Sequence, residues 1–236
     1  MKSRVKTSSA QHTSRDLLEG TARAPDPIPI PALKVAFDKT LAALGLVLLS
    51  PLFLGVALAM AVDGLLHPEN RGPVFYKEDR VSQGRIFQLY KFRVAKTAML
   101  DAEAQEKGHN HVKPLEKQED TKTNVGRWLQ RYYLDELPQL INILKGDMSF
   151  VGPRPWPVHM VEREVRAGNY RKHLLRPGLT GLVQAHKGEL QRFGGGRALD
   201  DAYIKACRTL GPLELLAFDL RLIRESISVL VRGEGL

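Results

Sequence analysis

Residues 41–62 form a run of 22 residues without a charged side chain, and only four of them are neither aliphatic nor aromatic. A helix of this length reaches across the hydrocarbon core of a bilayer, which is roughly 30 Å thick. The rest of the 236-residue chain has no second run of comparable length. A membrane segment is therefore expected, and a transporter or channel built from several spanning helices is excluded.

Ser50 and Pro51 interrupt this run near its middle, leaving 9 residues before them and 11 after. Proline removes a backbone hydrogen bond and collides with the preceding helical turn. At about 1.5 Å per residue the two halves reach about 14 and 17 Å, so neither crosses a bilayer alone. Basic residues, which favour the cytoplasm, flank both ends: Arg23, Lys34 and Lys39 before the run, and Arg71, Lys77 and Arg80 after it. The residues alone leave open a spanning helix and a broken helix that returns to the same face.

The segments on either side of the run differ in composition. Residues 1–32 end in the alternating prolines of 25–31 and are expected to form a disordered, Pro-rich leader. Residues 66–236 hold 28 basic and 21 acidic side chains and carry most of the formal net charge of +9. Such a charge suits nucleic acid, an anionic membrane surface or a phosphorylated substrate. No nucleic-acid-binding pattern is present, so nucleic acid is not expected as a partner.

The cysteine content limits the cellular context. Cys207 is the single cysteine of the chain and cannot close a disulfide within it. A disulfide-stapled secreted domain is therefore excluded, and a reducing compartment is expected.

Two short strands are expected after the apolar run. Residues 72–77 and 85–93 read as strands around a turn at 82–84. Alternation along the second strand places one set of side chains on a single face, namely Phe87, Leu89, Lys91 and Arg93. The sequence therefore predicts a short hairpin that carries two cations.

Asp135 and Glu136 stand at the start of a predicted helix that Gly146 ends. The helix is indicated by an apolar stripe at i, i+3, i+4 and i+7, formed by Leu137, Leu140, Ile141 and Leu144. Asp135 is a suitable N-cap, and Glu136 is favourable at the positive end of the helix dipole. Capping alone therefore explains both carboxylates.

Two arginines beside prolines favour a second interpretation. Arg154 lies between Pro153 and Pro155, and Arg176 precedes Pro177. Proline restricts the backbone around a guanidinium, which suits a fixed fork for phosphate oxygens. Carboxylates, rigid arginines and a helix N-terminus together indicate a site for a diphosphate and a divalent metal.

These motifs resemble those of the bacterial sugar transferases, the monotopic polyprenyl-phosphate phosphoglycosyl transferases. The resemblance runs from about Lys34 to the C-terminus, and its motifs are Gly72-Pro73-Val74-Phe75, Leu89-Tyr90-Lys91-Phe92-Arg93, Leu134-Asp135-Glu136-Leu137-Pro138-Gln139, Gly146-Asp147-Met148-Ser149-Phe150-Val151-Gly152-Pro153-Arg154-Pro155 and Arg176-Pro177-Gly178-Leu179-Thr180-Gly181. It implies that Ser50 and Pro51 break a re-entrant membrane helix over 33–65. It also implies the short catalytic form of the family, without the N-terminal extension of larger members.

The resemblance further implies an activity. A sugar 1-phosphate would pass from a nucleotide diphosphate sugar, expected to be a UDP-sugar, to polyprenyl (undecaprenyl) phosphate with release of UMP. This is the first membrane step of exopolysaccharide, capsule, O-antigen or glycoprotein glycan synthesis. Asp135 is expected to form a covalent phosphosugar intermediate, with Glu136 as its catalytic partner and Mg²⁺ held by both. The implied substrate-binding residues are Lys91, Arg93, Arg131, Arg154 and Arg176.

The expected fold is α/β in the α+β sense and mostly helical. It combines the re-entrant helix with a compact cytoplasmic catalytic domain over 66–236, which holds the hairpin and interfacial amphipathic helices. The expected location is the bacterial inner membrane, in contact with its lipid from the cytoplasmic face. A membrane-anchored basic scaffold without chemistry remains the alternative function.

A last helix is expected to begin at Pro212, after Gly211. Its apolar residues recur at intervals of three and four, at Leu213, Leu216, Leu220, Ile223, Ile227 and Leu230. Such a face can lie on lipid, pack in the core or form the seam of a homodimer, and the sequence leaves these arrangements open.

Overall fold

The computed structural model describes residues 25–101 and 118–231. These residues form a mostly helical fold, as the sequence predicts, with two small two-stranded sheets, of which the sequence predicts only the hairpin. The main helices are α1 (Ala32–Leu48), α2 (Ser50–Leu66), α4 (Asn124–Arg131), α5 (Gln139–Lys145), α6 (Val158–Arg166), α9 (Gly195–Thr209) and α10 (Pro212–Val231). Shorter helical turns are η1 (Pro68–Asn70), η3 (Glu119–Thr121), η4 (Leu134–Glu136), α7 (Arg171–Leu174), α8 (Leu182–Ala185) and η5 (Lys187–Phe193).

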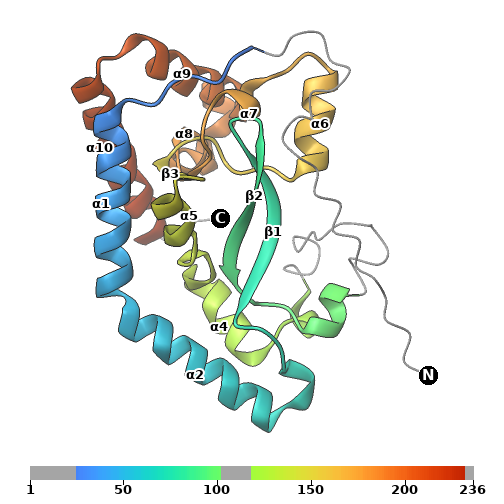
Figure 1. Cartoon of the computed structure of the whole chain (residues 1–236). Helices are drawn as coiled ribbons and strands as arrows, with labels where there is room; N and C mark the ends of the chain where they lie inside the picture. Colours follow the sequence, from blue (N-terminus) through green and yellow to red (C-terminus); the bar gives the residue numbers. More distant parts are fainter. Residues whose placement is uncertain (1–24, 102–117, 232–236) are drawn as a thin grey trace.

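Helices α1 and α2 meet at a 56° bend and follow two adjoining edges of the molecule (Figure 1). Leu49 links them, Ser50 is the first residue of α2 and Pro51 lies in its first turn, where the missing N–H of proline costs least. The helix therefore breaks where the sequence predicts. In the described part of the chain no helix taken alone is long and apolar enough to cross a bilayer, whereas this bent pair meets both criteria together.

The bent helix pair has one face packed on the rest of the chain and one face left open. On the packed face Ala42 joins the core around Leu140, and Val56 and Met60 pack around Phe92. The open face exposes large apolar side chains, which are Leu33, Leu41, Leu44, Val47, Leu48, Leu54, Leu58, Val62, Leu65 and Leu66. So wide an apolar surface is unusual for a protein surface that meets only water.

A hairpin runs through the middle of the molecule (Figure 1). Strand β1 (Phe75–Ser82) pairs antiparallel with β2 (Arg85–Phe92). Gln83 and Gly84 join them, both with positive φ, and such two-residue turns match the twist of paired strands. The hairpin confirms the prediction, but β1 continues to Ser82, beyond the predicted end at residue 77. Charged residues that point inward concealed the second half of this strand.

A parallel sheet of two short strands stands beside the hairpin. Strand β3 (Ser149–Val151) pairs with β4 (Gly178–Thr180). The turn after β3 is fixed by two further bonds: the Gly152 N–H donates to the Thr180 carbonyl at 2.9 Å, and the Gly178 N–H donates to the Pro153 carbonyl at 2.9 Å. The sheet thereby holds the backbone of Pro153-Arg154-Pro155 in place.

Replacing Gly178 by alanine is expected to destabilise this sheet. The added Cβ would lie 2.1 Å from the Gly152 nitrogen and 2.4 Å from the Thr180 oxygen, both backbone atoms. Strain of this kind costs about 1–3 kcal/mol, and thermal unfolding in detergent measures it. Gly188→Ala is the matched control because its Cβ would meet nothing within 4 Å. Equal unfolding midpoints for the two variants would contradict the prediction.

The helix predicted to start at Asp135 and Glu136 begins later than expected, and it buries a different face from the one that the apolar stripe predicts. Residues 134–136 form the separate turn η4, and α5 begins at Gln139. The buried residues of α5 include Leu140, Asn142 and Ile143, whereas Leu144 is 39% exposed. Asn142 explains the rotation, because its amide donates to the Gln88 carbonyl at 2.7 Å and its oxygen accepts from the Tyr90 N–H at 2.9 Å. A buried polar residue thus sets the helix face, which an apolar stripe cannot reveal.

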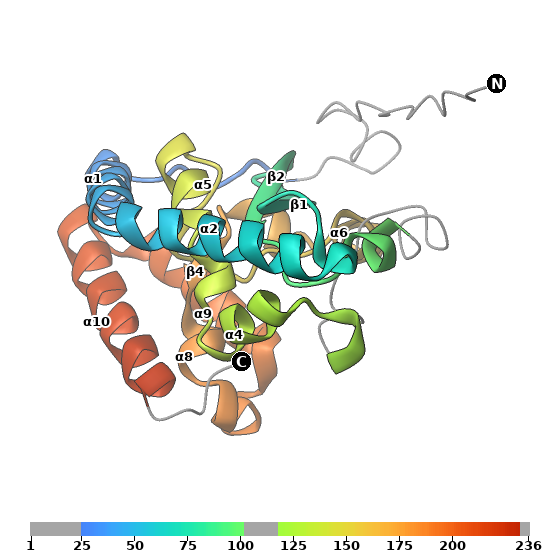
Figure 2. The same cartoon turned by 90° about the horizontal axis from the view of Figure 1, so that it is seen from below.

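Helix α10 begins at Pro212, as predicted, and lies beside α1 on one side of the molecule (Figure 2). Its buried face is formed by Leu215, Asp219, Leu222 and Ser226. In the predicted apolar stripe, by contrast, Leu213, Leu220 and Ile227 are exposed. Ile223 packs against the core, so core packing accounts for only part of this stripe, and the exposed residues leave an outward role on lipid or in a dimer.

The predicted disordered leader of 1–32 differs from the structure at its end. Residues 1–24 lie outside the described residues, but 25–31 run in extended form along the body. The Ile28 N–H donates to the Leu174 carbonyl at 2.9 Å, and its side chain is buried in the core with Tyr203 and Leu222. One apolar side chain and one backbone bond thus fix a segment whose prolines indicated only an extended backbone.

Candidate active site

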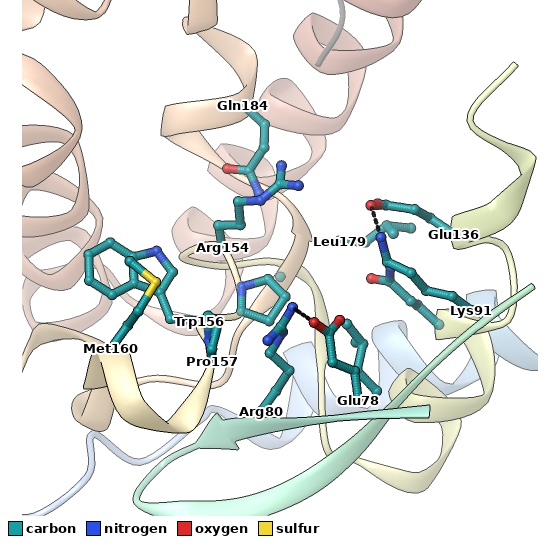
Figure 3. A pocket seen from close by; sticks show the side chains of 14 residues that line it. Glu78, Arg80, Lys91, Glu136, Arg154, Trp156, Pro157, Met160, Leu179 and Gln184 are labelled. Atoms are coloured by element: carbon teal, nitrogen blue, oxygen red, sulfur yellow. Dashed lines mark ion pairs between the residues drawn. The ribbon is translucent and has the colours of Figure 1, made fainter. Parts of the chain in front are cut away.

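A polar cavity of about 230 Å³ lies between the hairpin, the turn η4 and the loop after β3 (Figure 3). Its wall combines residues of both charges from segments far apart in the sequence. The lining residues are Glu78, Arg80, Leu89, Lys91, Glu136, Gln139, Arg154, Pro155, Trp156, Pro157, Met160, Gly178, Leu179 and Gln184. Such a convergence of charged groups in one cavity marks the candidate active site.

Asp135 and Glu136 lie side by side on η4, next to Lys91 of β2. The Lys91 Nζ is 3.2 Å from Glu136 Oε1 and 3.7 Å from Asp135 Oδ2. Asp135 is only 4% exposed. The N-cap residues of η4 and α5 are Tyr133 and Pro138, so Asp135 is not the N-cap that the sequence predicts. The turn is preceded by Tyr133 in the left-handed region, at φ 57°, a conformation that large residues adopt mainly where the surroundings impose it.

The charges around Glu136 keep it ionised. Burial raises the pKa of Glu136, but the charges of Lys91 and Arg154, with hydrogen bonds from Lys91 and Gln139, outweigh burial and hold the pKa below its usual value. A carboxyl group with a lowered pKa is a carboxylate at neutral pH. Glu136 is therefore suited to bind cations or orient a donor, and not to act as a general acid.

Replacing Lys91 by methionine is expected to raise the pKa of Glu136, because burial then acts against less positive charge. A lowered pKa stabilises the fold above the unfolded value near 4.5, and this contribution is lost as the pH falls through the folded value. In the variant, Glu136 should take up its proton at a higher pH than in the wild type. A ¹³C NMR titration of glutamate-labelled protein measures this, with Glu136→Gln assigning the signal; an unchanged midpoint would contradict the electrostatic assignment.

Arg154 is the second predicted cation that the structure brings to the cavity. It follows the turn that the β3–β4 sheet fixes, and its charge reaches Glu136 strongly enough to lower the pKa of that carboxyl group. Figure 3 shows its side chain on the same cavity wall as Gln184. Glu136, Lys91 and Arg154 thus line one cavity, and Asp135 lies beside Lys91, just behind the cavity wall.

The other three predicted substrate-binding arginines do not line this cavity. Arg93 is 1% exposed, and its guanidinium donates to backbone carbonyls of Asn70, Pro73 and Ala95 at 2.8–2.9 Å. Arg131 is exposed, with its guanidinium carbon 5.8 Å from the centre of the Tyr132 ring. Arg176 lines a separate small cavity that Tyr203 and Cys207 share. Periodicity and flanking prolines cannot distinguish such structural roles from ligand binding.

Sequence reasoning missed several residues of the cavity wall. Glu78 and Arg80 are both buried on the inward face of β1, and Arg80 Nη2 lies 2.5 Å from Glu78 Oε1. Arg80 is one of the basic residues that flank the apolar run in the sequence, and the structure buries its side chain. Two opposite charges at i and i+2 of a strand were the available signal. Trp156 and Gln184 carried no comparable signal.

An apolar cavity of about 310 Å³ adjoins the polar one. Glu136, Arg154, Leu179 and Gln184 line both cavities. Its remaining wall comes mainly from apolar residues of α5, β3, α10 and the link between η4 and α5, including Leu137, Leu140, Phe150, Ile223, Ile227 and Val229. The charged cluster therefore lies where a polar and an apolar compartment meet.

The donor set around Asp135 and Glu136 fits a magnesium ion that completes its coordination with a ligand. Mg²⁺ in proteins commonly uses one or two carboxylates together with substrate phosphates and water. No cluster of three or more metal-ligating side chains occurs among residues 25–101 and 118–231, so these residues alone do not enclose a metal ion. The Lys91 ammonium lies close to both carboxylates, so a metal ion would bring a second positive charge into its neighbourhood.

Sequence comparison identifies the family to which the chain belongs. The profile of the bacterial sugar transferases matches residues 30–233. The chain belongs to the bacterial sugar transferase family.

The chain is similar to several characterised members of that family. It is 33% identical over 214 residues to the exopolysaccharide production protein PSS of Rhizobium leguminosarum bv. phaseoli, covering 86% of this chain and 98% of that protein. It is 36% identical over 165 residues to the undecaprenyl-phosphate glucose phosphotransferase of Komagataeibacter xylinus, covering 66% of this chain and 29% of that protein. It is 35% identical over 197 residues to the UDP-glucose:undecaprenyl-phosphate glucose-1-phosphate transferase of Escherichia coli, covering 82% of this chain and 36% of that protein. The chain thus spans about a third of the length of the latter two relatives.

Proposed function

We propose that this chain transfers a sugar 1-phosphate from a UDP-sugar to undecaprenyl phosphate and releases UMP. The observation that carries the proposal is that Glu136 and Arg154 line both a polar and an apolar cavity, with Lys91 in the wall of the polar one. Asp135 lies directly behind this wall, 3.7 Å from the Lys91 ammonium. A sugar nucleotide suits the first compartment and an isoprenoid suits the second. The names of the relatives, which include sugar-phosphate transferases to undecaprenyl phosphate and an exopolysaccharide production protein, support the same reaction.

The reaction proceeds in two displacements at one phosphorus atom. A carboxylate oxygen of Asp135 bonds to the β-phosphorus while the bond from that phosphorus to the bridging oxygen breaks, and UMP leaves with the bridging oxygen. An oxygen of undecaprenyl phosphate then attacks the same phosphorus, and the Asp135 carboxylate leaves as an anion. Because a carboxylate is a weak nucleophile, positioning and charge neutralisation supply most of the rate.

The neighbouring side chains provide that positioning. Lys91 lies within 4 Å of both carboxylates, which places its positive charge beside the attacking oxygen and the phosphate oxygens. Arg154, fixed by its turn, presents a guanidinium to the same region. Mg²⁺ held by Asp135 and Glu136 would neutralise diphosphate charge as a Lewis acid. The ionised Glu136 also holds Lys91 near the nucleophile.

The bent helix pair gives the site access to lipid. Its exposed apolar side chains and broken geometry suit a re-entrant segment that enters one leaflet and returns, which is a monotopic placement on the cytoplasmic face of the inner membrane. Labelling of cysteines introduced at Lys39 and at Glu69 in intact and opened vesicles tests this placement. Accessibility of both positions from the cytoplasmic side supports it, and opposite accessibility would show a spanning helix.

The activity is tested by UMP release. Purified full-length protein in detergent or nanodiscs is incubated with Mg²⁺, undecaprenyl phosphate and each member of a panel of UDP-sugars. Release of UMP that requires the lipid and yields a lipid-linked sugar diphosphate supports the proposal. A protein that binds membrane but releases no UMP from any donor would favour the non-catalytic scaffold instead.

A further inference from the structure

Arg80 is buried in the wall of the polar cavity with part of its hydrogen-bonding capacity unused. Its side chain lines the cavity (Figure 3), and the residue is 6% exposed. Nη2 meets Glu78, whereas the buried Nε and Nη1 have no hydrogen-bond partner among the described residues. Buried polar groups in folded proteins are almost always paired, so unpaired donors at a cavity wall point to a ligand.

The backbone holds this arginine firmly in place. Arg80 pairs with Phe87 across the hairpin on one side, and on the other it forms an isolated antiparallel bridge with Pro157. Both partners are themselves buried. The guanidinium therefore cannot reach bulk water by a shift of its strand, and the cavity is the space from which a partner can approach it.

The charge of Arg80 is already balanced. Glu78 lies 2.5 Å from its Nη2 and is 3% exposed, so the pair is close to neutral as a unit. A phosphate that approached this guanidinium would also approach the Glu78 carboxylate. Lys91 and Arg154, by contrast, lie at the end of the cavity that holds Glu136. A neutral oxygen acceptor is therefore the partner that suits Arg80.

We propose that Arg80 donates hydrogen bonds to an uncharged oxygen of the sugar nucleotide, either a carbonyl oxygen of the base or a hydroxyl of the sugar, and thereby sets donor affinity. This proposal rests on the proposed function. Glu78 holds the guanidinium and neutralises it, which makes Glu78 a positioning residue. The diphosphate remains with Lys91, Arg154 and the carboxylates.

The test uses two variants, one that removes the charges of both Glu78 and Arg80 and one that keeps both charges but removes the guanidinium. Glu78→Gln with Arg80→Gln removes both charges together, which avoids leaving a buried carboxylate alone. Arg80→Lys keeps the positive charge for Glu78 but loses the fork of donors. Arg85→Gln is the matched control, because Arg85 is exposed at the start of β2 in the same hairpin and does not line the cavity. Thermal unfolding in detergent confirms that each variant is folded.

The KM for the UDP-sugar is expected to rise by about 10- to 100-fold in both variants, the range for loss of a hydrogen bond to a charged group. The kcat should change by less than about threefold, because binding far from the reacting phosphorus affects ground state and transition state alike. Arg85→Gln should leave both constants unchanged. If either cavity variant folds and keeps the wild-type KM, the proposal is wrong.

Equilibrium binding shows whether the acceptor oxygen belongs to the base or to the sugar. It also tests the Arg80 contact separately from the transferase activity. Calorimetry with UMP and with the UDP-sugar is carried out on the full-length wild type and both variants. Weaker binding of both ligands assigns the base, and weaker binding of the UDP-sugar alone assigns the sugar. Wild-type binding that depends on Arg80 without UMP release would refute the transferase activity but not this contact. Normal turnover with unchanged binding in the variants would refute only the contact.

Discussion

Asp135→Asn is expected to lower the rate of sugar-phosphate transfer by at least about 10⁴-fold, the scale seen when a nucleophile is removed. An amide oxygen of similar shape cannot attack the β-phosphorus, so neither UMP release nor the covalent intermediate should form. The measurement is UMP release, together with labelling of the protein by a UDP-sugar that carries ³²P at its β-phosphorus. The protein should remain folded, because asparagine keeps the shape of the buried side chain.

Two further variants make this result specific. Asp147→Asn is the matched control, because Asp147 lies just after α5, is partly exposed and pairs with Lys145 at 3.6 Å outside the polar cavity. It should retain near-normal activity. Glu136→Gln should lower the rate while still allowing some labelling, because the Glu136 carboxylate holds the Lys91 ammonium in place and does not itself bond to phosphorus. Normal turnover by Asp135→Asn would end the proposal of a covalent intermediate.

Asp219→Leu is expected to lower the free energy of unfolding by about 3–5 kcal/mol, the scale for removing one partner of a buried ion pair, because Lys34 then keeps only the more distant carboxylate of Asp38, at 3.8 Å. The Asp219 carboxylate of α10 lies 2.5 Å from the Lys34 ammonium of α1 and accepts a hydrogen bond from the Tyr203 hydroxyl at 2.8 Å. Lys34 is 4% exposed and Asp219 is 1% exposed. The apparent midpoint of thermal unfolding in detergent should fall by roughly 10 °C.

An exposed pair and a double variant provide the comparison. Asp201→Leu removes an aspartate whose side chain is 59% exposed and lies 3.7 Å from Arg171, so its effect should stay within about 1 kcal/mol. Lys34→Met combined with Asp219→Leu removes both charges of this pair, while the buried Asp38 keeps its hydrogen bonds from Ser149 and the Phe150 N–H. The double variant should recover part of the lost stability. If it were as unstable as Asp219→Leu alone, the loss would stem from packing and not from the buried lysine.

Local chemistry made part of the fold and site predictable. The break at Ser50 and Pro51 follows from the missing proline donor, and the hairpin follows from strand-forming residues around a turn. The acidic pair, Lys91 and Arg154 were found because motifs of the family occur in order. Each of these features depends on residues close together in the sequence.

The features that escaped prediction depend on partners far away in the chain. Arg93 donates hydrogen bonds to carbonyl groups up to 23 positions away. Asn142 directs one face of α5 onto β2 by hydrogen bonds to residues more than 50 positions earlier. The buried face of α10 is set by Asp219, whose partner Lys34 is 185 positions away. Periodicity describes which faces an element can offer, but tertiary contacts decide which face is used.

That separation of 185 positions has a consequence for biosynthesis. Lys34 is synthesised 185 residues before the carboxylate of Asp219. Until then the lysine has only the more distant carboxylate of Asp38, 3.8 Å away on the same helix, to offset its burial. Helix α1 therefore reaches its final packing only after α10 has been synthesised and has docked against it.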